Sequence, residues 1–290
     1  RYADVIERAL YNGVLAGLSL SGDRFFYANP LSFHPTSPVL HHVRSDAERQ
    51  PWYGCACCPP NIARLLASLG SYVYGLADDT VAVHLYAAST LEFTIAGSNC
   101  RLTQKTVYPW EGEAEFTVGV PEPLNFTLAL RIPAWADGWS IDGADVSAVE
   151  KGYAYITRRW KAGDRVRLSL PIAPRRTYAH PAVRQDAWKV AIEYGPIVYC
   201  IEGVDNGADL GRFALPADAE LQSEFRAEFL GGCTVITGTG LRHDPEKAAG
   251  AGPSLYRPSA HRTPVPFTAV PYALWNNRGS SEMRVWLAEV

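Results

Sequence analysis

The 290-residue sequence lacks most features that mark membrane, nucleic-acid-binding or secreted proteins. Its longest apolar runs fall well short of the roughly 20 residues that a membrane-spanning helix needs, so no membrane partner is expected. It has no block of lysine and arginine, and its net charge of −3 disfavours a nucleic-acid partner. The first residues lack the pattern of a secretory signal peptide. A composition of 47% hydrophobic and 20% charged residues is ordinary for a globular protein with ample core.

Several common catalytic motifs are missing as well. There is no Ser/His/Asp arrangement, no phosphate-cradling glycine loop and no dinucleotide-binding fingerprint. The short stretch Gly238-Thr239-Gly240 does not count as one. The residues that carry chemistry therefore have to be sought elsewhere in the chain.

The six cysteines do not show the regular spacing of a disulfide framework. Cys57 and Cys58 are adjacent, and a bridge between neighbours needs strained backbone geometry. We therefore expect reduced thiols, which favour a cytoplasmic location. Cys100, Cys200 and Cys233 lie in strand-like contexts, which predicts that they are small buried hydrophobic residues.

What the chain does have is a cluster of three cysteines, Cys55, Cys57 and Cys58, directly ahead of a helical pattern. Residues 62–69 repeat apolar side chains at helical spacing, and the Pro-Pro pair after Cys58 suits the first helical positions. The sequence therefore predicts Cys57 and Cys58 at or just before a helix N-terminus. There the unbonded N–H groups and the helix dipole lower a thiol's pKa and favour the thiolate. A thiolate is both a soft metal ligand and a nucleophile.

Three interpretations of the cluster follow from the residues alone. It is a structural zinc site, a buried cluster without metal, or a functional metal-bound thiolate. Zinc prefers four ligands, and the local candidates to complete a zinc site are His34, His41 and His42. In its plainest interpretation His41-His42 is a hydrogen-bonded surface pair on a polar loop. The residues leave all three interpretations open.

The remaining sequence divides into a helical part and two β-rich parts. Apolar residues recur at helical spacing in residues 1–18, residues 30–51 form a polar loop, and the helix after the cysteines ends near Gly75. Beyond it, period-2 alternation with turn signals at short spacing predicts antiparallel sandwiches over residues 77–175 and 176–290.

The chain begins within a helical pattern and has no initiator methionine. We therefore expect it to be the C-terminal part of a longer protein.

Seven stretches, spread over essentially the whole chain, carry a family resemblance. The most specific is Trp52-Tyr53-Gly54-Cys55-Ala56-Cys57-Cys58-Pro59-Pro60-Asn61-Ile62-Ala63-Arg64. The others are Tyr2–Glu7, Tyr27–Pro30, Arg131–Trp135, Trp160–Asp164, Glu193–Tyr199 and Pro271–Gly279. In these stretches the sequence resembles glycoside hydrolase family 127 and its relative, family 146, the β-L-arabinofuranosidases.

The resemblance implies an α + β multidomain protein. Residues 1–76 would be the C-terminal remnant of an (α/α)6-barrel catalytic domain that carries the Cys-x-Cys-Cys motif. Residues 77–175 and 176–290 would be two antiparallel β-sandwich domains.

The resemblance also implies the chemistry. In the family a zinc ion is held by a Glu-x-Cys pair and by the last two cysteines of the Cys-x-Cys-Cys motif, which are Cys57 and Cys58 here. The first of these two, Cys57, would be the nucleophile of a retaining glycosidase that forms a thioglycosyl intermediate. No Glu-x-Cys occurs in the chain. We therefore expect these ligands and the general-acid Glu upstream of Arg1, and weak zinc binding without turnover for this stretch alone.

The substrate implied by the resemblance is an arabinose-containing oligosaccharide or glycopeptide. Tyr27, His41, His42 and Trp52 would line the sugar pocket. The alternatives are a glycosidase of different sugar specificity on the same scaffold, or a carbohydrate-binding or structural module with a structural zinc. The implied location is a bacterial cytoplasm, and a homodimer is compatible with the sequence.

Overall fold

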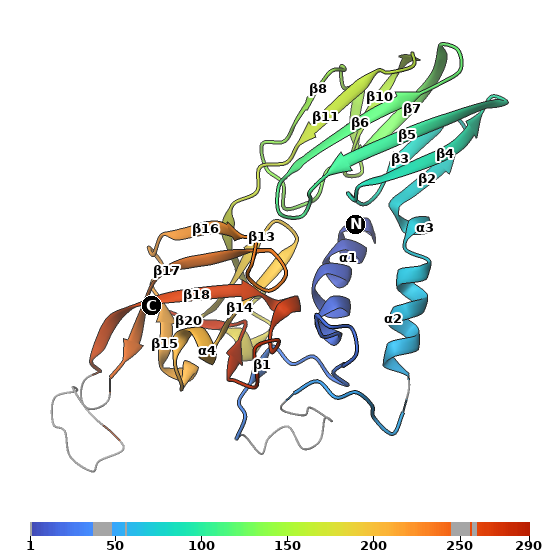
Figure 1. The fold of residues 1–290 in the computed structure, drawn as a ribbon. Helices are drawn as coiled ribbons and strands as arrows, with labels where there is room; N and C mark the ends of the chain where they lie inside the picture. Colours follow the sequence, from blue (N-terminus) through green and yellow to red (C-terminus); the bar gives the residue numbers. More distant parts are fainter. Residues whose placement is uncertain (1, 37–47, 56, 245–255, 257–259) are drawn as a thin grey trace. The chain divides into compact units, whose positions relative to one another are not determined.

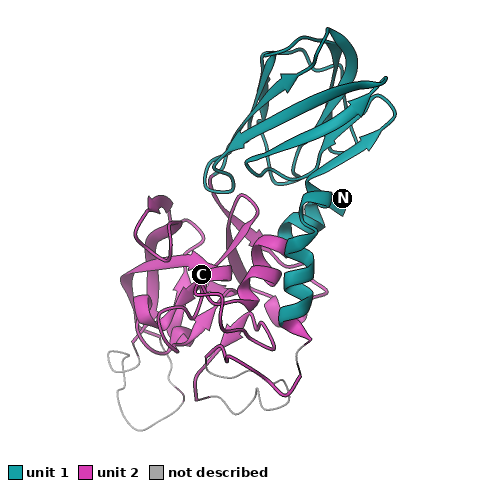
Figure 2. Cartoon of the chain, turned by 45° about the vertical axis from the view of Figure 1, so that its right-hand side comes forward, with its two compact units in different colours: residues 1–9, 59–172 teal, residues 10–58, 173–290 magenta. Residues whose placement is uncertain are grey.

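A computed structural model describes residues 2–36, 48–55, 57–244, 256 and 260–290 (Figure 1). The chain forms two compact units, each built from two separate stretches of sequence (Figure 2). Unit 1 comprises Arg1–Ala9 and Pro59–Ile172. Unit 2 comprises Leu10–Cys58 and Ala173–Val290. The N-terminal residues therefore contribute to both units.

The helices lie mainly near the N-terminus, as the apolar spacing predicts. Helix α1 (Tyr2–Arg8) continues into a π-helical turn η1 (Ala9–Val14) and a 3-10 turn η2 (Leu15–Gly17). After the cysteine cluster come α2 (Cys58–Ala67) and the short α3 (Gly70–Val73), so the helix predicted up to Gly75 is broken once. The remaining helical turns among the described residues are α4 (Gly203–Asn206), η4 (Arg184–Asp186), η5 (Leu210–Arg212) and η6 (Tyr272–Leu274).

Unit 1 contains two five-stranded sheets, which confirms the β structure predicted after the helices. The strands of the first, in spatial order, are β2 (Tyr74–Ala77), β3 (Thr80–Val83), β7 (Leu124–Arg131), β10 (Tyr153–Trp160) and β9 (Ala148–Glu150). Those of the second are β4 (Ser89–Ile95), β5 (Ser98–Thr106), β6 (Glu113–Gly119), β11 (Arg165–Ser169) and β8 (Ser140–Asp142). The pairs are antiparallel except for β3–β7, which is parallel.

The two sheets of unit 1 lie face to face (Figure 1). Aromatic side chains pack between them. Phe93 of β4 meets Phe126 of β7, with ring centroids 5.9 Å apart. Trp160 of β10 is fully buried, stacks on Phe126 and donates its indole N–H to the Phe126 carbonyl at 2.9 Å. A buried indole needs such a partner, since an unsatisfied donor in the core is costly.

A buried ionic cluster in unit 1 joins α1 to β7. Arg131 and Glu7 are each 2% exposed and form an ion pair, and Arg131 also bonds Asp4 at 2.8 Å. Tyr108 donates its hydroxyl to Glu7 at 2.6 Å. Burial opposes the charged guanidinium, but Glu7, Tyr86 and Tyr108 together outweigh it and hold the pKa of Arg131 above its usual range.

Unit 2 is built on one hydrogen-bonded sheet of ten strands. Its path, in spatial order, is β1 (Ser32–Phe33), β19 (Met283–Arg284), β14 (Ile197–Glu202), β18 (Arg262–Pro271), β17 (Cys233–His243), β15 (Phe213–Leu215), β20 (Leu287–Glu289), β13 (Lys189–Tyr194) and β12 (Pro174–Tyr178). Strand β16 (Leu221–Arg226) pairs with β17 off this path. A further pairing of β13 with β14 closes part of the sheet into a ring. All described pairs are antiparallel except β15–β20.

The N-terminal stretch of unit 2 is anchored by buried contacts with the C-terminal stretch. Phe26 stacks on the buried Trp275, with ring centroids 4.9 Å apart. Arg49 is buried over the Phe26 ring and donates to the carbonyls of Trp275 and Ala16 at 2.8 and 2.9 Å. Within its described residues, the polar loop expected over residues 30–51 thus contains one short strand, β1, and one buried arginine.

Asn12 makes a second anchor, and its removal gives a testable effect. Its side chain donates to the Pro196 carbonyl at 2.9 Å and accepts from the Val198 N–H at 2.8 Å. We expect Asn12→Ala to lower the free energy of unfolding by about 1–3 kcal/mol, because buried polar groups lose their partners. Urea unfolding measures this. Asn29→Ala, which removes only an exposed 3.3 Å contact, is the control, and equal midpoints for both variants would contradict the anchor.

Candidate functional site

The cysteine cluster stands at the beginning of α2, as predicted. Cys57 directly precedes the helix, Cys58 is its first residue, and Pro59 and Pro60 occupy the first turn. Proline is suited to this position because the N–H groups of the first turn have no partner within the helix. The remaining N–H groups and the helix dipole favour negative charge on the neighbouring sulfurs.

The two adjacent thiols differ in environment. Cys57 is exposed and Cys58 is half-buried, and their sulfurs lie 3.6 Å apart without a disulfide. Hydrogen bonds from Cys55, then Cys58 and Tyr27, lower the pKa of Cys57. Burial, and then the neighbouring Cys57, raise the pKa of Cys58. The exposed Cys57 is therefore the sulfur that ionises first and that an incoming molecule can reach.

Tyr27 reaches Cys57 because a small aromatic cluster holds it there. Its ring lies 5.6 Å from that of the buried Tyr53, which in turn meets Phe25 edge-on at 5.0 Å. Phe25 exchanges two backbone hydrogen bonds of 2.9 Å with Gln50. Of the predicted pocket residues, the structure therefore brings Tyr27 to the thiols.

The other predicted pocket residues are placed differently. Trp52 is 64% exposed, three residues before Cys55. His41 and His42 lie outside the described residues. A role of these side chains in binding a sugar stays a prediction.

The sulfur pair fits part of a zinc site. Two thiolates on one tetrahedral zinc, each at about 2.3 Å, lie about 3.8 Å apart, and the observed separation is 3.6 Å. Zinc takes four ligands, and among the described residues no cluster of three or more metal-binding side chains includes these cysteines. The pair can thus supply two ligands.

The three distant cysteines are buried, as predicted. Burial raises the pKa of Cys200 well above its ordinary value and that of Cys233 to about 11. Burial also raises the pKa of Cys100. These thiols stay protonated at neutral pH and serve as core residues.

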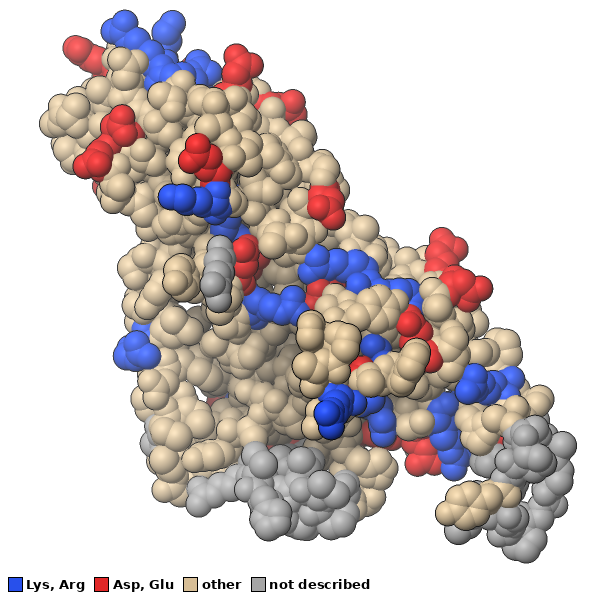
Figure 3. Space-filling model, turned by 180° about the vertical axis from the view of Figure 1, so that it is seen from behind, with Lys and Arg blue, Asp and Glu red and all other residues tan. Residues whose placement is uncertain are grey.

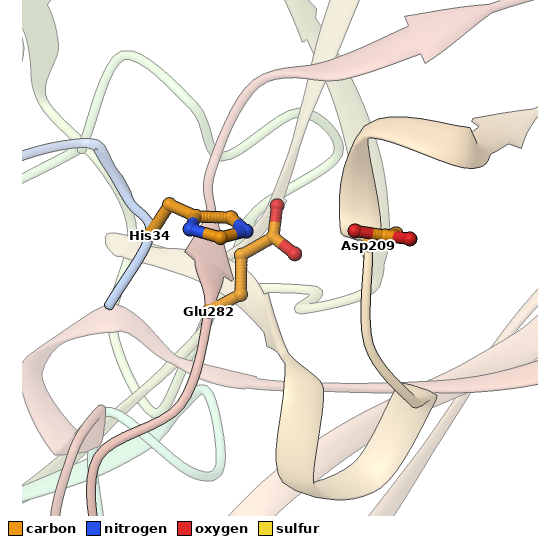
Figure 4. Close-up of side chains that lie close together, drawn as sticks. All are labelled: His34, Asp209 and Glu282. Carbon is orange, nitrogen blue, oxygen red and sulfur yellow. The ribbon is translucent and has the colours of Figure 1, made fainter. Parts of the chain in front are cut away.

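A second group of ligand-type side chains lies in unit 2, and no sequence pattern predicts it. Side-chain atoms of His34, Asp209 and Glu282 all lie within 4.8 Å of one another (Figure 4). His34 was a candidate to complete the cysteine site, but the structure groups it with these two carboxylates instead. The three positions are too far apart in the sequence for any spacing rule to connect them.

Charged side chains of both signs are mixed on the face shown in Figure 3. Lys and Arg lie among Asp and Glu there, without a continuous patch of positive or negative charge. No helix in the described part of the chain is long and apolar enough to cross a membrane.

Three family models match consecutive parts of the chain. They are the GH127 catalytic domain of β-L-arabinofuranosidases over residues 1–71, the GH127 middle domain over residues 80–172, and the family 127 C-terminal domain over residues 174–288. All three describe parts of glycoside hydrolases. The chain belongs to glycoside hydrolase family 127.

Individual relatives agree with this assignment. A non-reducing end β-L-arabinofuranosidase of Bifidobacterium longum subsp. longum is 38% identical over 98% of this chain and 45% of its own length. A crystal structure of a GH127 β-L-arabinofuranosidase from Geobacillus stearothermophilus T6 superposes with a TM-score of 0.93 at 46% identity, over all of this chain and 46% of its own. A second GH127 β-arabinofuranosidase structure gives a TM-score of 0.87 at 35% identity, again over all of this chain and 46% of its own. The chain thus spans about half the length of these relatives.

Proposed function

We propose that this chain is part of a retaining β-L-arabinofuranosidase whose nucleophile is Cys57. The observation that carries the proposal is that two adjacent thiols at the start of α2 differ in exposure and in the direction of their pKa shift. Family 127 models match residues 1–71, 80–172 and 174–288 of the same chain. The substrate is an arabinose-containing oligosaccharide or glycopeptide, and the bond broken is that of a terminal β-L-arabinofuranose.

The proposed reaction has two displacements at the anomeric carbon. The Cys57 sulfur attacks that carbon and forms a C–S bond while the C–O bond to the leaving group breaks, and the leaving oxygen takes a proton from a general acid. Water then gives a proton to the conjugate base of that general acid and attacks the same carbon, the C–S bond breaks, and Cys57 returns as the thiolate. Each displacement inverts the configuration, so the two together retain it.

The environments of the two thiols support Cys57 over Cys58 as the nucleophile. Cys57 is the exposed sulfur with the lowered pKa, and Tyr27 adds a hydrogen bond to it. Cys58 is partly buried with a raised pKa, so it is the poorer nucleophile of the two. A zinc ion bound by both sulfurs would keep them deprotonated at neutral pH.

We also propose that residues 1–76 are the end of an (α/α)6 barrel, with sandwich domains over residues 77–175 and 176–290. Exposed apolar side chains on the helices support the barrel. Helix α2 has no buried residue and Leu66 on it is 42% exposed, while Tyr2 and Val5 of α1 are exposed as well. A helix needs an apolar partner for such a face.

Binding of the sugar is proposed to involve Tyr27, Trp52, His41 and His42. Trp52 offers an exposed flat aromatic face, which suits the apolar side of a sugar ring. Tyr27 has a hydroxyl beside the reacting sulfur, where it can orient a sugar hydroxyl as well as the thiol.

The test is hydrolysis by the full-length protein that contains this chain. We expect release of arabinose from an aryl β-L-arabinofuranoside and none from the matched aryl α-L-arabinofuranoside. NMR of the first product formed should show the β anomer. An initial α anomer would contradict a covalent cysteine intermediate. No release from either substrate, with zinc still bound, would favour a module in which zinc has a structural role.

A further inference from the structure

We propose that His34, Asp209 and Glu282 form a second metal site in unit 2, which binds a first-row divalent cation such as Mn²⁺ or Zn²⁺ independently of the cysteine pair. The proposal does not depend on the proposed glycosidase activity.

The fold places the three side chains together through backbone pairing. Strand β1 pairs with β19 in the register Phe33↔Met283, so the next antiparallel position sets His34 opposite Glu282. Asp209 directly precedes η5, whose first N–H, that of Leu210, bonds the Glu282 carboxylate at 2.7 Å. In Figure 4 the imidazole of His34 and the carboxylate of Asp209 point toward that of Glu282. One nitrogen and two carboxylate ligands thus converge within 4.8 Å.

The central carboxylate is fixed in position before any ion binds. Glu282 is buried, with one oxygen accepting from the Leu210 N–H and the other from the Arg284 Nε at 3.2 Å. A carboxylate has about four lone-pair sites, so both oxygens retain acceptor capacity. Carboxylates that bind metals are typically held by such outer hydrogen bonds.

The imidazole is held in a similar way. The Thr36 hydroxyl lies 3.1 Å from His34 Nδ1 and can accept its proton, which leaves the Nε2 lone pair for a metal. The Thr36 N–H donates to Nδ1 at 3.3 Å, so metal binding through Nε2 requires a change of tautomer that gives up this hydrogen bond. Asp209 is paired with Arg212 at 2.9 Å, and both are about half exposed, so an ion displaces that pair at little cost.

The ligand set selects the type of ion. One imidazole with two carboxylates suits manganese and zinc, whereas calcium takes six to eight oxygen ligands. The three residues line a cavity of about 510 Å³, which leaves room for water in the remaining coordination positions. A bound ion would join three segments of unit 2 and stabilise it by mass action.

The test uses Mn²⁺ and the full-length protein. Mn²⁺ prefers oxygen and nitrogen over thiolate ligands, so electron paramagnetic resonance counts this site without interference from the cysteines. We expect Asp209→Asn to weaken Mn²⁺ binding at least about tenfold and to remove the Mn²⁺-dependent rise in Tm. Asparagine tolerates the left-handed backbone of residue 209, so this variant should fold. Glu282→Gln and His34→Gln should weaken binding as well.

Two further variants make the outcome decisive. Asp218→Asn removes the same charge from an exposed position in unit 2 and should bind Mn²⁺ like the unaltered protein. A variant with both Cys57→Ser and Cys58→Ser should also retain Mn²⁺. The proposal is overturned if the unaltered protein binds no Mn²⁺ at millimolar concentration, if Asp209→Asn binds it unchanged, or if the double cysteine variant loses it.

Discussion

Replacing Cys57 with serine in the full-length protein is expected to lower kcat by about 10⁴-fold or more. Loss of the nucleophile in a covalent hydrolase removes the whole two-step path, and comparable losses are known for other nucleophiles. A serine hydroxyl is far less acidic than a thiol, and hydrogen bonds lower the pKa of the exposed Cys57 further. The measurement is the steady-state hydrolysis of an aryl β-L-arabinofuranoside at matched zinc content.

The neighbouring cysteines supply the controls for this result. Cys58→Ser should lose zinc affinity, and part of its activity should return with excess zinc, whereas zinc should not restore Cys57→Ser. Cys55→Ser removes only a hydrogen-bonding neighbour, so its activity should fall within about tenfold of the unaltered enzyme. Activity that survives Cys57→Ser at full zinc content would remove Cys57 as nucleophile.

Replacing Glu7 with glutamine is expected to lower the free energy of unfolding of unit 1 by about 3–5 kcal/mol. Glu7 is the buried partner of Arg131, and its loss leaves the buried guanidinium with Asp4, which is 33% exposed. Breaking one partner of a buried pair is costly because the remaining charge stays desolvated. Chemical unfolding followed by circular dichroism measures the change.

A surface ion pair of the same unit is the matched control. Arg101 and Glu92 are 62% and 73% exposed, so Glu92→Gln should change stability by less than about 1 kcal/mol. Removing both buried charges, with Glu7→Gln and Arg131→Met, should cost less than the sum of the single changes. Equal effects of Glu7→Gln and Glu92→Gln would show that the buried pair contributes no more than a surface one.

Local features of the fold were predictable because they depend on neighbouring residues. The beginning of α2 at Cys58 follows from the Pro-Pro pair and the apolar spacing behind it. Alternating strands such as β6 and β10 show their period directly.

Long-range assembly was not predictable, because no local pattern records it. The stacking of Phe26 on Trp275 and the bonds of Asn12 to the turn at Pro196 place residues 10–58 in unit 2. Two of the stretches that carry the family resemblance are in contact in the folded protein. Glu7 and Arg131 lie in two of them and meet as a buried ion pair.

The same reasoning applies to the candidate sites. A cysteine cluster before a helix is visible in the sequence. The structure adds that the pKa of Cys57 is lowered and that of Cys58 is raised. The group of His34, Asp209 and Glu282 depends on the pairing of β1 with β19, which joins positions some 250 residues apart. Only the folded backbone could indicate it.

The discontinuous units also impose an order on biosynthesis. Both sheets of unit 1 lie within residues 74–169, so their strands can pair before unit 2 is complete. Residues 10–58, which carry the cysteine cluster, also need partners in residues 173–290, such as Trp275 for Phe26 and Pro196 for Asn12. At ordinary translation rates that second stretch takes roughly 10 s to emerge from the ribosome. The segment that bears the thiols is therefore made before the stretch that completes its unit.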